Sequence, residues 1–374
     1  MALLLTGATG FVGMEILTRW LENSDRRVYA IVRADSDDAA RERLRPGLAS
    51  AFGDEGAGVD GQLIALAGDV EQPGLGLTED KLDELSREVG IVVHSAASVS
   101  FTLGLEESRR INVEGTRNML DFAERCRRLE RFTYVSTAYV AGTYPGVFRE
   151  DQLAEGQEFR NAYERSKFEA EQLVQGRSHL LPVQVLRPSI VVGERPSGWT
   201  SSFNVLYGPL KAFARGVVPA LPARANAPVD VVPVDYVADA AYELSANGPD
   251  GTYHLVAGRR ATTVGRLAEL ASRHFEREPP PTFPPPVYRR VVYPLMLRRL
   301  AGRARERFRR IEVFFPYFSM RVRYDDTRAR KRLEPAGIKV TPVEGYFHRL
   351  LDFAHRAEWG KRSLGRLHAR RLAR

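Results

Sequence analysis

Two side chains that could move a proton, Tyr163 and Lys167, stand four residues apart in a segment with helical character. On a helix, side chains at this spacing lie on one face. A carbonyl group that accepts hydride needs a proton donor, and an ammonium group beside a phenol favours the phenolate, which makes the phenol a better acid. The pair therefore predicts that Tyr163 is a catalytic acid tuned by Lys167. The same ammonium could hold the ribose of a nicotinamide cofactor.

Hydroxyl groups that could assist this acid precede it in the chain. Ser136 and Thr137 end a predicted strand, and Thr137 lies 26 residues before Tyr163. A hydroxyl group at the end of a strand could donate to the carbonyl oxygen that Tyr163 protonates, which would give the developing negative charge two donors. Ser136 and Thr137 are therefore both candidate catalytic residues.

A glycine-rich loop, TGATGFVG at residues 6–13, joins the first predicted strand to an amphipathic segment. At this spacing the first glycine permits a tight turn, the second lets the backbone approach a pyrophosphate, and the third lets helix and strand pack closely. The phosphates would lie at the positive end of the helix dipole. The loop therefore predicts a dinucleotide site that includes Thr6, Gly7, Thr9, Gly10, Phe11, Val12 and Gly13.

The ends of the later strands indicate which dinucleotide is bound. A site that prefers NAD normally has a carboxylate about 20 residues past the loop. Here the second strand ends at Arg33, whose planar guanidinium suits a 2′-phosphate, so NADP(H) is favoured even though Asp35 lies nearby. Asp69 follows the third predicted strand, where it could contact the adenine or simply belong to a turn that ends the strand. Further cofactor contacts are expected at Asp69, Val70, Ser95, Ala96, Ala97, Pro188, Ser189 and Ile190.

Short β-branched runs alternate with helix-like stretches over the first 260 residues, a pattern typical of a parallel sheet covered by helices. The fold class predicted is a doubly wound α/β sheet of Rossmann type with a smaller C-terminal substrate region. Helices are expected at Val12–Glu22, Glu106–Cys126 and Tyr163–Gln175. Strands are expected at Leu3–Leu5, Arg27–Val32, Gln62–Ala67, Ile91–His94, Arg131–Val135, Val183–Arg187, Val229–Val232 and Thr252–Leu255.

Composition divides the chain near residue 277. Residues 1–277 are predicted to form the dinucleotide-binding domain, with substrate-region insertions from about 190, and the proline-rich residues 278–287 a stiff linker. Residues 281–374 carry 24 Lys and Arg against 8 Asp and Glu, a net charge of +16. This excess of positive charge at one end of the chain indicates an anionic partner such as a membrane surface, a nucleic acid or a phosphate-bearing substrate or carrier. The alternative is that the basic side chains only form a solvated surface. No zinc-finger or aromatic ribonucleoprotein motif is present, so nucleic acid is not expected.

The basic C-terminal region, residues 288–374, contains three distinct segments. Tyr288–Leu300 predicts either an interfacial helix or lid, or an ordinary packed helix, and Pro294 argues against one long uninterrupted helix. Phe314–Phe318 is expected to be core or the wall of a substrate tunnel. The last fourteen residues hold six basic side chains and no acidic one, which predicts a frayed or surface-bound tail.

Composition also excludes several classes of protein. The chain has 374 residues, 44% of them apolar, and one cysteine, Cys126, which excludes a disulfide scaffold and a multi-cysteine zinc site; no metal is expected. No apolar run approaches the ~20 residues that cross a bilayer. The start of the sequence leaves no room for a signal peptide. A cytoplasmic location is predicted, with peripheral contact at the inner membrane face as a further expectation; the oligomeric state is not indicated.

In this order, the glycine loop, the Ser-Thr strand end, the Tyr-Lys pair and the segment 187–190 resemble the extended short-chain dehydrogenase/reductase superfamily over roughly residues 1–260. The resemblance implies that Thr137, five residues before Gly142, is the carbonyl donor rather than Ser136. It also implies that Asn112 supports Lys167 through a water or the backbone. A buried polar group that only links helix to strand is the alternative for Asn112.

The segments 32–34, 68–70, 96–101, 134–137 and 230–237 narrow the match, because together they resemble the fatty acyl-CoA reductase and thioester reductase branch. That resemblance implies NADPH-dependent reduction of an acyl thioester to an aldehyde and, in some members, to an alcohol. Because the sequence begins at its first predicted strand, the expected substrate is acyl-CoA or a thioester on a separate acyl carrier protein. The alternative is another extended reductase acting on a sterol, a sugar nucleotide or another secondary alcohol or ketone.

Overall fold

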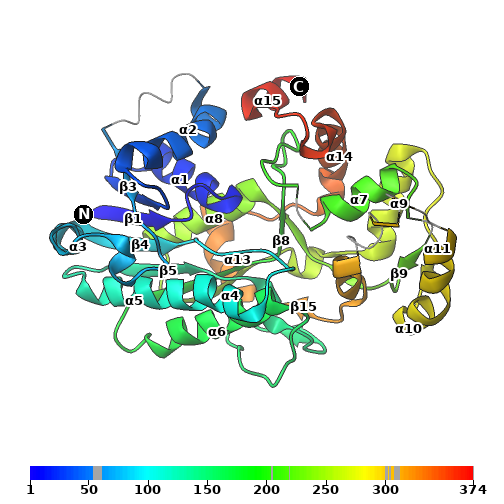
Figure 1. Cartoon of the computed structure of the whole chain (residues 1–374), viewed down its shortest axis with the longest axis horizontal. Coiled ribbons are helices and arrows are strands. Elements are labelled where there is room, and N and C mark those ends of the chain that lie inside the picture. The colour runs from blue at the N-terminus through cyan, green and yellow to red at the C-terminus, as the bar shows by residue number, and fades with distance from the viewer. Residues whose placement is uncertain are drawn as a thin grey trace.

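A parallel β-sheet forms the centre of the molecule (Figure 1). The computed structural model describes residues 1–53, 61–203, 205–218, 220–299, 302, 305, 306 and 312–373. Within these ranges the large sheet has seven strands in the order β3-β2-β1-β4-β5-β7-β12. The strands are β1 (Ala2–Thr6), β2 (Val28–Val32), β3 (Leu63–Ala67), β4 (Val89–His94), β5 (Arg131–Val135), β7 (Val183–Pro188) and β12 (Gly251–Leu255).

The strand order confirms the doubly wound α/β fold. The chain runs outward from β1 to β3, returns to β4 on the other side of β1, and then continues in the opposite direction. Leu5 accordingly pairs with Ala30 of β2 and with Val93 of β4. In such sheets, ligands bind at the carboxyl ends of the strands where the order reverses. The fold therefore points to the carboxyl ends of β1 and β4 as the site.

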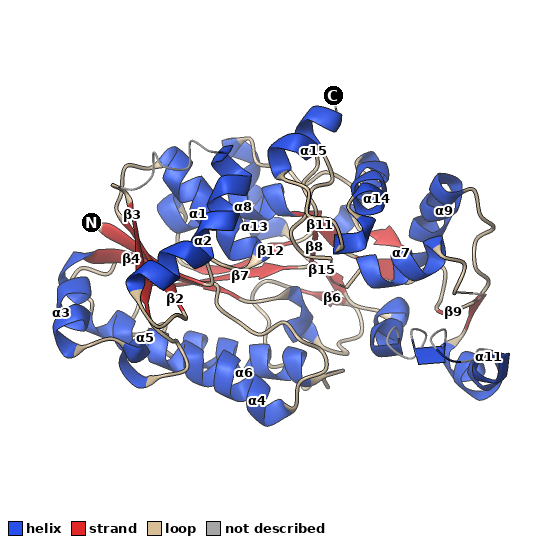
Figure 2. Ribbon diagram, turned by 45° about the horizontal axis from the view of Figure 1, so that its top comes forward, coloured by secondary structure: helices blue, strands red, loops and turns tan. Residues whose placement is uncertain are grey.

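Helices cover both faces of the sheet (Figure 2). The strands are buried on both sides: in β1, Leu3 and Leu5 pack with Trp20 on one face, whereas Leu4 packs with Phe122 on the other. One face carries α1 (Phe11–Asn23), α2 (Asp37–Phe52), α8 (Val234–Asn247) and α13 (Thr327–Leu333). The other face carries α3 (Glu79–Glu88), α4 (Leu105–Arg109), α5 (Gly115–Arg125) and α6 (Ala162–Gly176).

Two of the expected elements are divided in the structure. The expected helix Glu106–Cys126 becomes α4 and α5 joined by a single π-helical stretch, η3 (Arg110–Glu114). Such π turns are frequent at functional sites. The expected strand Val229–Val232 becomes two short strands outside the large sheet. They are β10 (Pro228–Val229), which pairs with β13 (Thr262–Thr263), and β11 (Val231–Pro233), which pairs with β8 (Ile190–Val192).

A second apolar core lies beyond the carboxyl ends of the strands. It joins Tyr139 and Phe148 to Tyr317, Tyr346 and Leu350, so the described part of the C-terminal region packs directly against the first part of the chain. Thr282 of the proline-rich segment pairs with Leu221; the domain limits at 277 and 287 stay predictions. The elements here are β6 (Val147–Phe148), α7 (Tyr207–Ala214), β9 (Leu221–Pro222), α9 (Val264–Phe275), β14 (Thr282–Phe283), η7 (Glu312–Ser319), β15 (Arg323–Tyr324), α14 (Phe347–Arg356) and α15 (Arg366–Leu372).

The segment from residue 285 to 299 is helical throughout. It comprises α10 (Pro285–Val287), the π turn η6 (Tyr288–Val292) and α11 (Tyr293–Arg299). Pro294 therefore does not end the helical segment; it is the second residue of α11, directly after the π turn η6. Leu300 lies outside the described residues. In the described part of the chain, no helix combines the length and the apolarity that crossing a bilayer requires.

The described part of the C-terminal tail is bound to the rest of the protein, so of the two expected states, frayed or surface-bound, the structure shows the second. Arg366 of α15 is buried, and its Nε lies 2.7 Å from Glu194 while its second guanidinium nitrogen lies 3.0 Å from Glu15 of α1. Arg370 also pairs with Glu194, at 2.8 Å. The carboxylates that receive these arginines stand more than 170 residues away in the sequence, so a basic run alone gives no sign of them.

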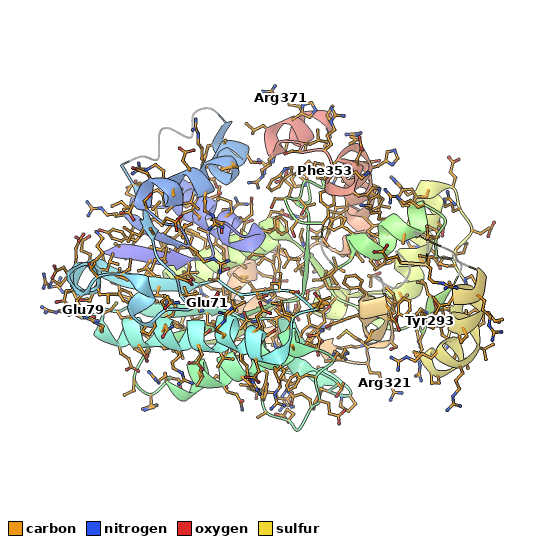
Figure 3. All side chains as sticks on the ribbon, viewed as in Figure 1. Glu71, Glu79, Tyr293, Arg321, Phe353 and Arg371 are labelled. Atoms are coloured by element: carbon orange, nitrogen blue, oxygen red, sulfur yellow. The ribbon has the colours of Figure 1, made fainter. Side chains whose placement is uncertain are left out.

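We expect Arg366→Ala to lower the free energy of unfolding by about 3 kcal/mol, because it removes the buried guanidinium that pairs with both Glu15 and Glu194. The loss is limited because Arg370 still pairs with Glu194 and Arg19 still lies 3.9 Å from Glu15. Arg371→Ala is the matched control. Arg371 lies on the same helix at the outer surface and has no ion pair among the described residues (Figure 3); its loss should change stability by no more than about 0.5 kcal/mol. Urea denaturation measures both, and equally small effects would contradict the account of the tail.

Candidate active site

Helix α6 brings Tyr163 and Lys167 to the end of β5. The Lys167 ammonium donates to the carbonyl oxygen of Val135 at 2.8 Å and lies 4.2 Å from the centre of the Tyr134 ring. The Thr137 side chain lies beside the Tyr163 hydroxyl, and both residues line the same pocket. The proton donor, the lysine and one hydroxyl predicted from the sequence are thus brought together at the carboxyl edge of the sheet.

Burial dominates the electrostatics of this group. It raises the pKa of Tyr163 to about 12; the hydrogen bond from Thr137 opposes this rise and the Glu164 carboxylate adds to it. Burial lowers the pKa of Lys167 to about 7, and the Glu171 carboxylate acts in the opposite direction. Both side chains are therefore held toward their neutral forms, so the charge of Lys167 responds to any anionic group that enters the pocket.

The neighbouring hydroxyls, Ser136 and Thr137, point to different places. Ser136 Oγ donates to the buried Glu171 carboxylate at 2.5 Å. Glu171 also holds Arg187, whose Nε lies 3.0 Å away. Successive side chains at a strand end face opposite sides, which explains why only Thr137 reaches Tyr163. The structure therefore does not bring Ser136 into the donor pair.

Asn112 lies in the π turn η3 and connects the loop after β4 to α6. Its Nδ2 donates to Ser166 Oγ at 2.9 Å and to the Ser98 carbonyl at 3.1 Å, while its Oδ1 accepts from the Ser98 amide at 2.8 Å. Ser166 immediately precedes Lys167. Asn112 is thus placed where it links two elements of the site, and its effect on Lys167 through a water stays a prediction.

The glycine loop has the geometry that a pyrophosphate needs. Gly7 has φ +77°, and a Cβ on Gly13 would lie 2.1 Å from the Gly7 carbonyl oxygen, so neither position accepts a side chain. Gly10 caps α1 without a side-chain hydrogen bond. The first N–H groups of α1 therefore face the pocket without an intrahelical partner, and the helix dipole adds to their positive character. The loop fits a dinucleotide phosphate.

Two adjoining pockets contain most of the predicted cofactor residues. The central pocket also holds Thr137, Tyr163 and Phe101, and the arginine pocket also holds Arg43 and Glu71. Of the predicted residues, the central pocket is lined by Gly7, Gly10, Phe11, Val12, Gly13, Ser95, Ala97, Lys167, Pro188, Ser189 and Ile190. The arginine pocket is lined by Gly7, Thr9, Gly10, Arg33, Asp69, Val70, Ser95, Ala96 and Ala97.

Thr6 lines neither of these pockets. Its hydroxyl is hydrogen-bonded to His94 Nδ1 at 2.8 Å and accepts from the Ala96 amide at 3.3 Å. Thr6 therefore holds the start of the loop after β4 in place. His94 is fully buried, and burial lowers its pKa to about 3. Thr6 and His94 therefore support the shape of the pocket from outside it.

Arg43 is a site residue that the sequence reasoning missed. It lies on α2, lines the arginine pocket with Arg33, and donates to the Arg33 carbonyl oxygen. The Arg33 guanidinium lies 3.2 Å from Glu71, which is also 3.3 Å from Arg110. No motif spacing points to Arg43, because its place depends on how α2 packs beside β2. An arginine on the first helix after β2 was the only available signal.

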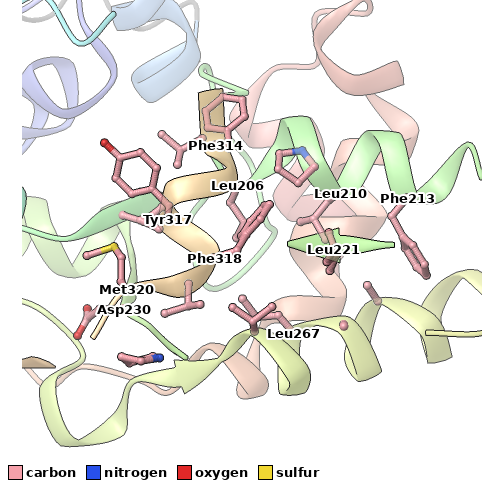
Figure 4. Close-up of a pocket in the computed structure, with 18 of the residues that line it drawn as sticks. Leu206, Leu210, Phe213, Leu221, Asp230, Leu267, Phe314, Tyr317, Phe318 and Met320 are labelled. Atoms are coloured by element: carbon pink, nitrogen blue, oxygen red, sulfur yellow. The ribbon is translucent and has the colours of Figure 1, made fainter. Parts of the chain in front are cut away.

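A third pocket, the apolar pocket, is drawn in Figure 4. It encloses about 950 Å³, counting space open to solvent, and its wall includes Leu206, Leu210, Phe213, Leu267, Phe314 and Phe318. This confirms the expectation that Phe314–Phe318 is core or tunnel wall. Tyr139, Ile190 and Val205 line both this pocket and the central one. The apolar pocket and the central pocket therefore share part of their walls.

The doubly wound sheet, the glycine loop and the Tyr163–Lys167 pair define an extended short-chain dehydrogenase/reductase. A sequence profile of the family described as "Male sterility protein" matches residues 5–241. Because the profile covers more than half of the chain, the protein belongs to this family.

Similar proteins agree with this assignment. A fatty acyl-CoA reductase 1 of Xenopus laevis is 30% identical over 284 residues, 66% of this chain and 55% of the frog protein, so the match spans about half of that relative. An isonitrile lipopeptide synthase of Streptomyces coeruleorubidus is 34% identical over 272 residues, 71% of this chain and 18% of the synthase. The solved terminal R domain of the myxalamid PKS-NRPS pathway superposes with a TM-score of 0.83 at 27% identity, covering 97% of this chain and 92% of that domain.

The depressed pKa of Lys167 makes stability depend on pH. Between about pH 7 and the ordinary lysine value of 10.5, the unfolded chain binds a proton at this position that the folded protein does not. The free energy of unfolding should therefore rise with pH across this window, by up to about 1.4 kcal/mol per pH unit, and Lys167→Met should lose this rise. Urea denaturation of both proteins without dinucleotide at pH 7 and pH 9.5 measures it; a constant difference between them would contradict the burial effect.

Proposed function

We propose that the protein is an NADPH-dependent reductase of an acyl thioester, either a fatty acyl-CoA or a thioester of an acyl carrier protein. The observation that carries the proposal is the junction of the apolar pocket with the central pocket at Tyr139, Ile190 and Val205. An acyl chain in the apolar pocket puts its thioester carbonyl beside Tyr163 and Thr137. Against a sugar nucleotide, the wall offers apolar side chains where a sugar needs hydrogen-bond partners.

The roles of the side chains follow from their geometry. Held along the central and arginine pockets, NADPH would supply the hydride. Thr137 and Tyr163 would donate hydrogen bonds to the carbonyl oxygen as its carbon is reduced, and Tyr163 would give that oxygen a proton. When the C=O bond forms again, the phenolate recovers the proton, and the C–S bond breaks with the electron pair leaving on sulfur. The thiolate then takes a proton from water, so the products are an aldehyde and a free thiol.

Lys167 is the group that makes Tyr163 an effective acid. Its nitrogen lies at the carboxyl end of β5, and the phosphates of a dinucleotide would favour its charged form, because an anion offsets the effect of burial. A charged Lys167 in turn lowers the pKa of Tyr163 toward the working range. The aldehyde is itself a carbonyl compound and can be reduced to an alcohol at the same site with a second NADPH.

Two arginines support the preference for NADPH over NADH. Arg33 and Arg43 line the pocket that would hold the adenosine ribose, and Glu71 keeps the Arg33 guanidinium in place. A 2′-phosphate can accept charge-assisted hydrogen bonds from both guanidinium groups.

A cytoplasmic role in lipid metabolism, with peripheral membrane contact, also belongs to this proposal. The net charge of +16 on residues 281–374 suits an anionic surface. Val287, Val291 and Leu295 are exposed at four-residue intervals along the helical segment 285–299 and could enter the headgroup region.

The proposed activity is tested by following NADPH oxidation with acyl-CoAs of different chain length, aldehydes, sterols and sugar nucleotides. A thiol reagent measures the coenzyme A released. Oxidation with acyl-CoA supports the proposal if it releases one thiol for each NADPH consumed when the aldehyde is the product, or one thiol for every two NADPH when the alcohol is. Oxidation with a sterol or a sugar nucleotide, and none with a thioester, would replace it with the alternative.

Tyr163→Phe should remove turnover and leave NADPH binding nearly intact, because it deletes the proton donor and keeps the ring. We expect kcat to fall by about 100-fold or more, with the NADPH Kd within about twofold by titration of protein fluorescence. A fully active variant would refute the role of Tyr163.

Arg33→Ala should raise the KM for NADPH by about tenfold or more, through loss of a charge-assisted hydrogen bond, and should leave the KM for NADH nearly unchanged. Arg41→Ala on α2 is the control, since Arg41 is exposed, pairs with Asp38 and does not line the arginine pocket. Steady-state kinetics of each variant with NADPH and with NADH measure the two KM values. An equal rise for NADPH and NADH would exclude the contact with a 2′-phosphate.

A further inference from the structure

We propose that Tyr317 is a positioning residue that connects the wall of the apolar pocket to the proton donor Tyr163. The inference rests on the proposed function and adds a residue to its machinery. Tyr317 lies in η7, about 150 residues after the Tyr-Lys pair, and no motif links it to the site. Its ring and its hydroxyl group have different tasks.

The ring of Tyr317 stands between the two pockets. It lines the apolar pocket and packs edge-on against Tyr139, with ring centres 5.2 Å apart. It also stacks on Phe101 at 5.2 Å with an interplanar angle of 14°. Phe101 lines the central pocket, and its ring centre is 5.6 Å from that of Tyr163. An acyl chain in the apolar pocket would therefore pack on a ring that belongs to the same stack as the proton donor.

The hydroxyl of Tyr317 holds the first turn of α6. It donates to Glu164 Oε1 at 2.7 Å and accepts from Asn161 Nδ2 at 2.7 Å. Asn161 is the N-cap of α6, and its side chain accepts from the Glu164 amide at 3.0 Å. Tyr163 lies between these two residues, so one hydroxyl group ties together both sides of the proton donor.

The hydrogen bond from Tyr317 matters because its acceptor, Glu164, is buried. The carboxylate is fully buried, and Arg160 supplies its other contacts, through the backbone amide at 2.9 Å and the guanidinium at 3.3 Å. A buried carboxylate that loses a donor must shift or take up a proton. Because Glu164 adjoins Tyr163 in the first turn of α6, a change in the position of Glu164 also moves the phenol. The Tyr317 hydroxyl therefore sets the position of the phenol, and the Tyr317 ring serves substrate binding.

The test separates the hydroxyl from the ring. With a long-chain acyl-CoA, Tyr317→Phe should lower kcat by about tenfold and leave both the acyl-CoA KM and the NADPH Kd within about twofold. Tyr317→Leu should in addition raise the KM for the long-chain thioester at least fivefold, because it removes the ring. Tyr346→Phe is the matched control: Tyr346 is buried in the same core, its hydroxyl has no hydrogen-bond partner among the described residues, and it lines none of the three pockets. It should leave kcat and KM unchanged.

A double-mutant cycle with Glu164→Gln tests whether the hydroxyl acts through Glu164. We expect Glu164→Gln to lower kcat by a similar factor, and the double variant to be no slower than the slower single variant. Tyr317→Phe with the kcat of the unaltered protein, or effects of the two substitutions that multiply, would overturn the proposal.

Hydrogen exchange gives a readout that does not need turnover. The amides of Tyr163, Glu164 and Arg165 should exchange faster in Tyr317→Phe than in the unaltered protein, and Tyr346→Phe should leave them unchanged. Unchanged exchange in Tyr317→Phe would contradict the positioning role. If the unaltered protein reduces no thioester, the proposed function fails while this measurement still decides the role of Tyr317.

Discussion

The hydrogen bond from the buried Lys167 ammonium to the carbonyl oxygen of Val135 is the contact on which the rest of the site depends. It joins α6 to the carboxyl end of β5, and one helical turn earlier it sets Tyr163 against Thr137. Burial disfavours the charged form of this side chain and lowers the Lys167 pKa to about 7. A bound anionic group would offset that penalty, and on the proposed function cofactor binding would therefore also activate the acid.

Most of the fold and the centre of the site could be predicted from the sequence. The strands are buried on both faces and read as short apolar runs, so their positions were recognisable and the doubly wound order followed. The glycine loop and Tyr163–Lys167 depend on local spacing: a turn that no side chain fits and one turn of helix. These motifs depend only on residues that are close together in the sequence, which is why they could be identified without a structure.

What could not be predicted depends on contacts between distant parts of the chain. The choice between Ser136 and Thr137 is made by Glu171, 35 residues beyond Ser136, and reasoning from the residues alone left both open. Arg43 enters the site only through the packing of α2. The basic tail resembles a frayed end because the carboxylates that bind Arg366 are remote in sequence. In each case the missing information is a partner that no periodicity or spacing encodes.

The most direct test of the central claim is the fate of the hydride. The protein is incubated with a long-chain acyl-CoA and NADPH carrying deuterium at both positions of nicotinamide C4, and the aldehyde is trapped and analysed by mass spectrometry. The account requires one deuterium on the aldehyde carbon and one free thiol for each NADPH consumed. NADPH oxidation without deuterium at that carbon, or without thiol release, would contradict it.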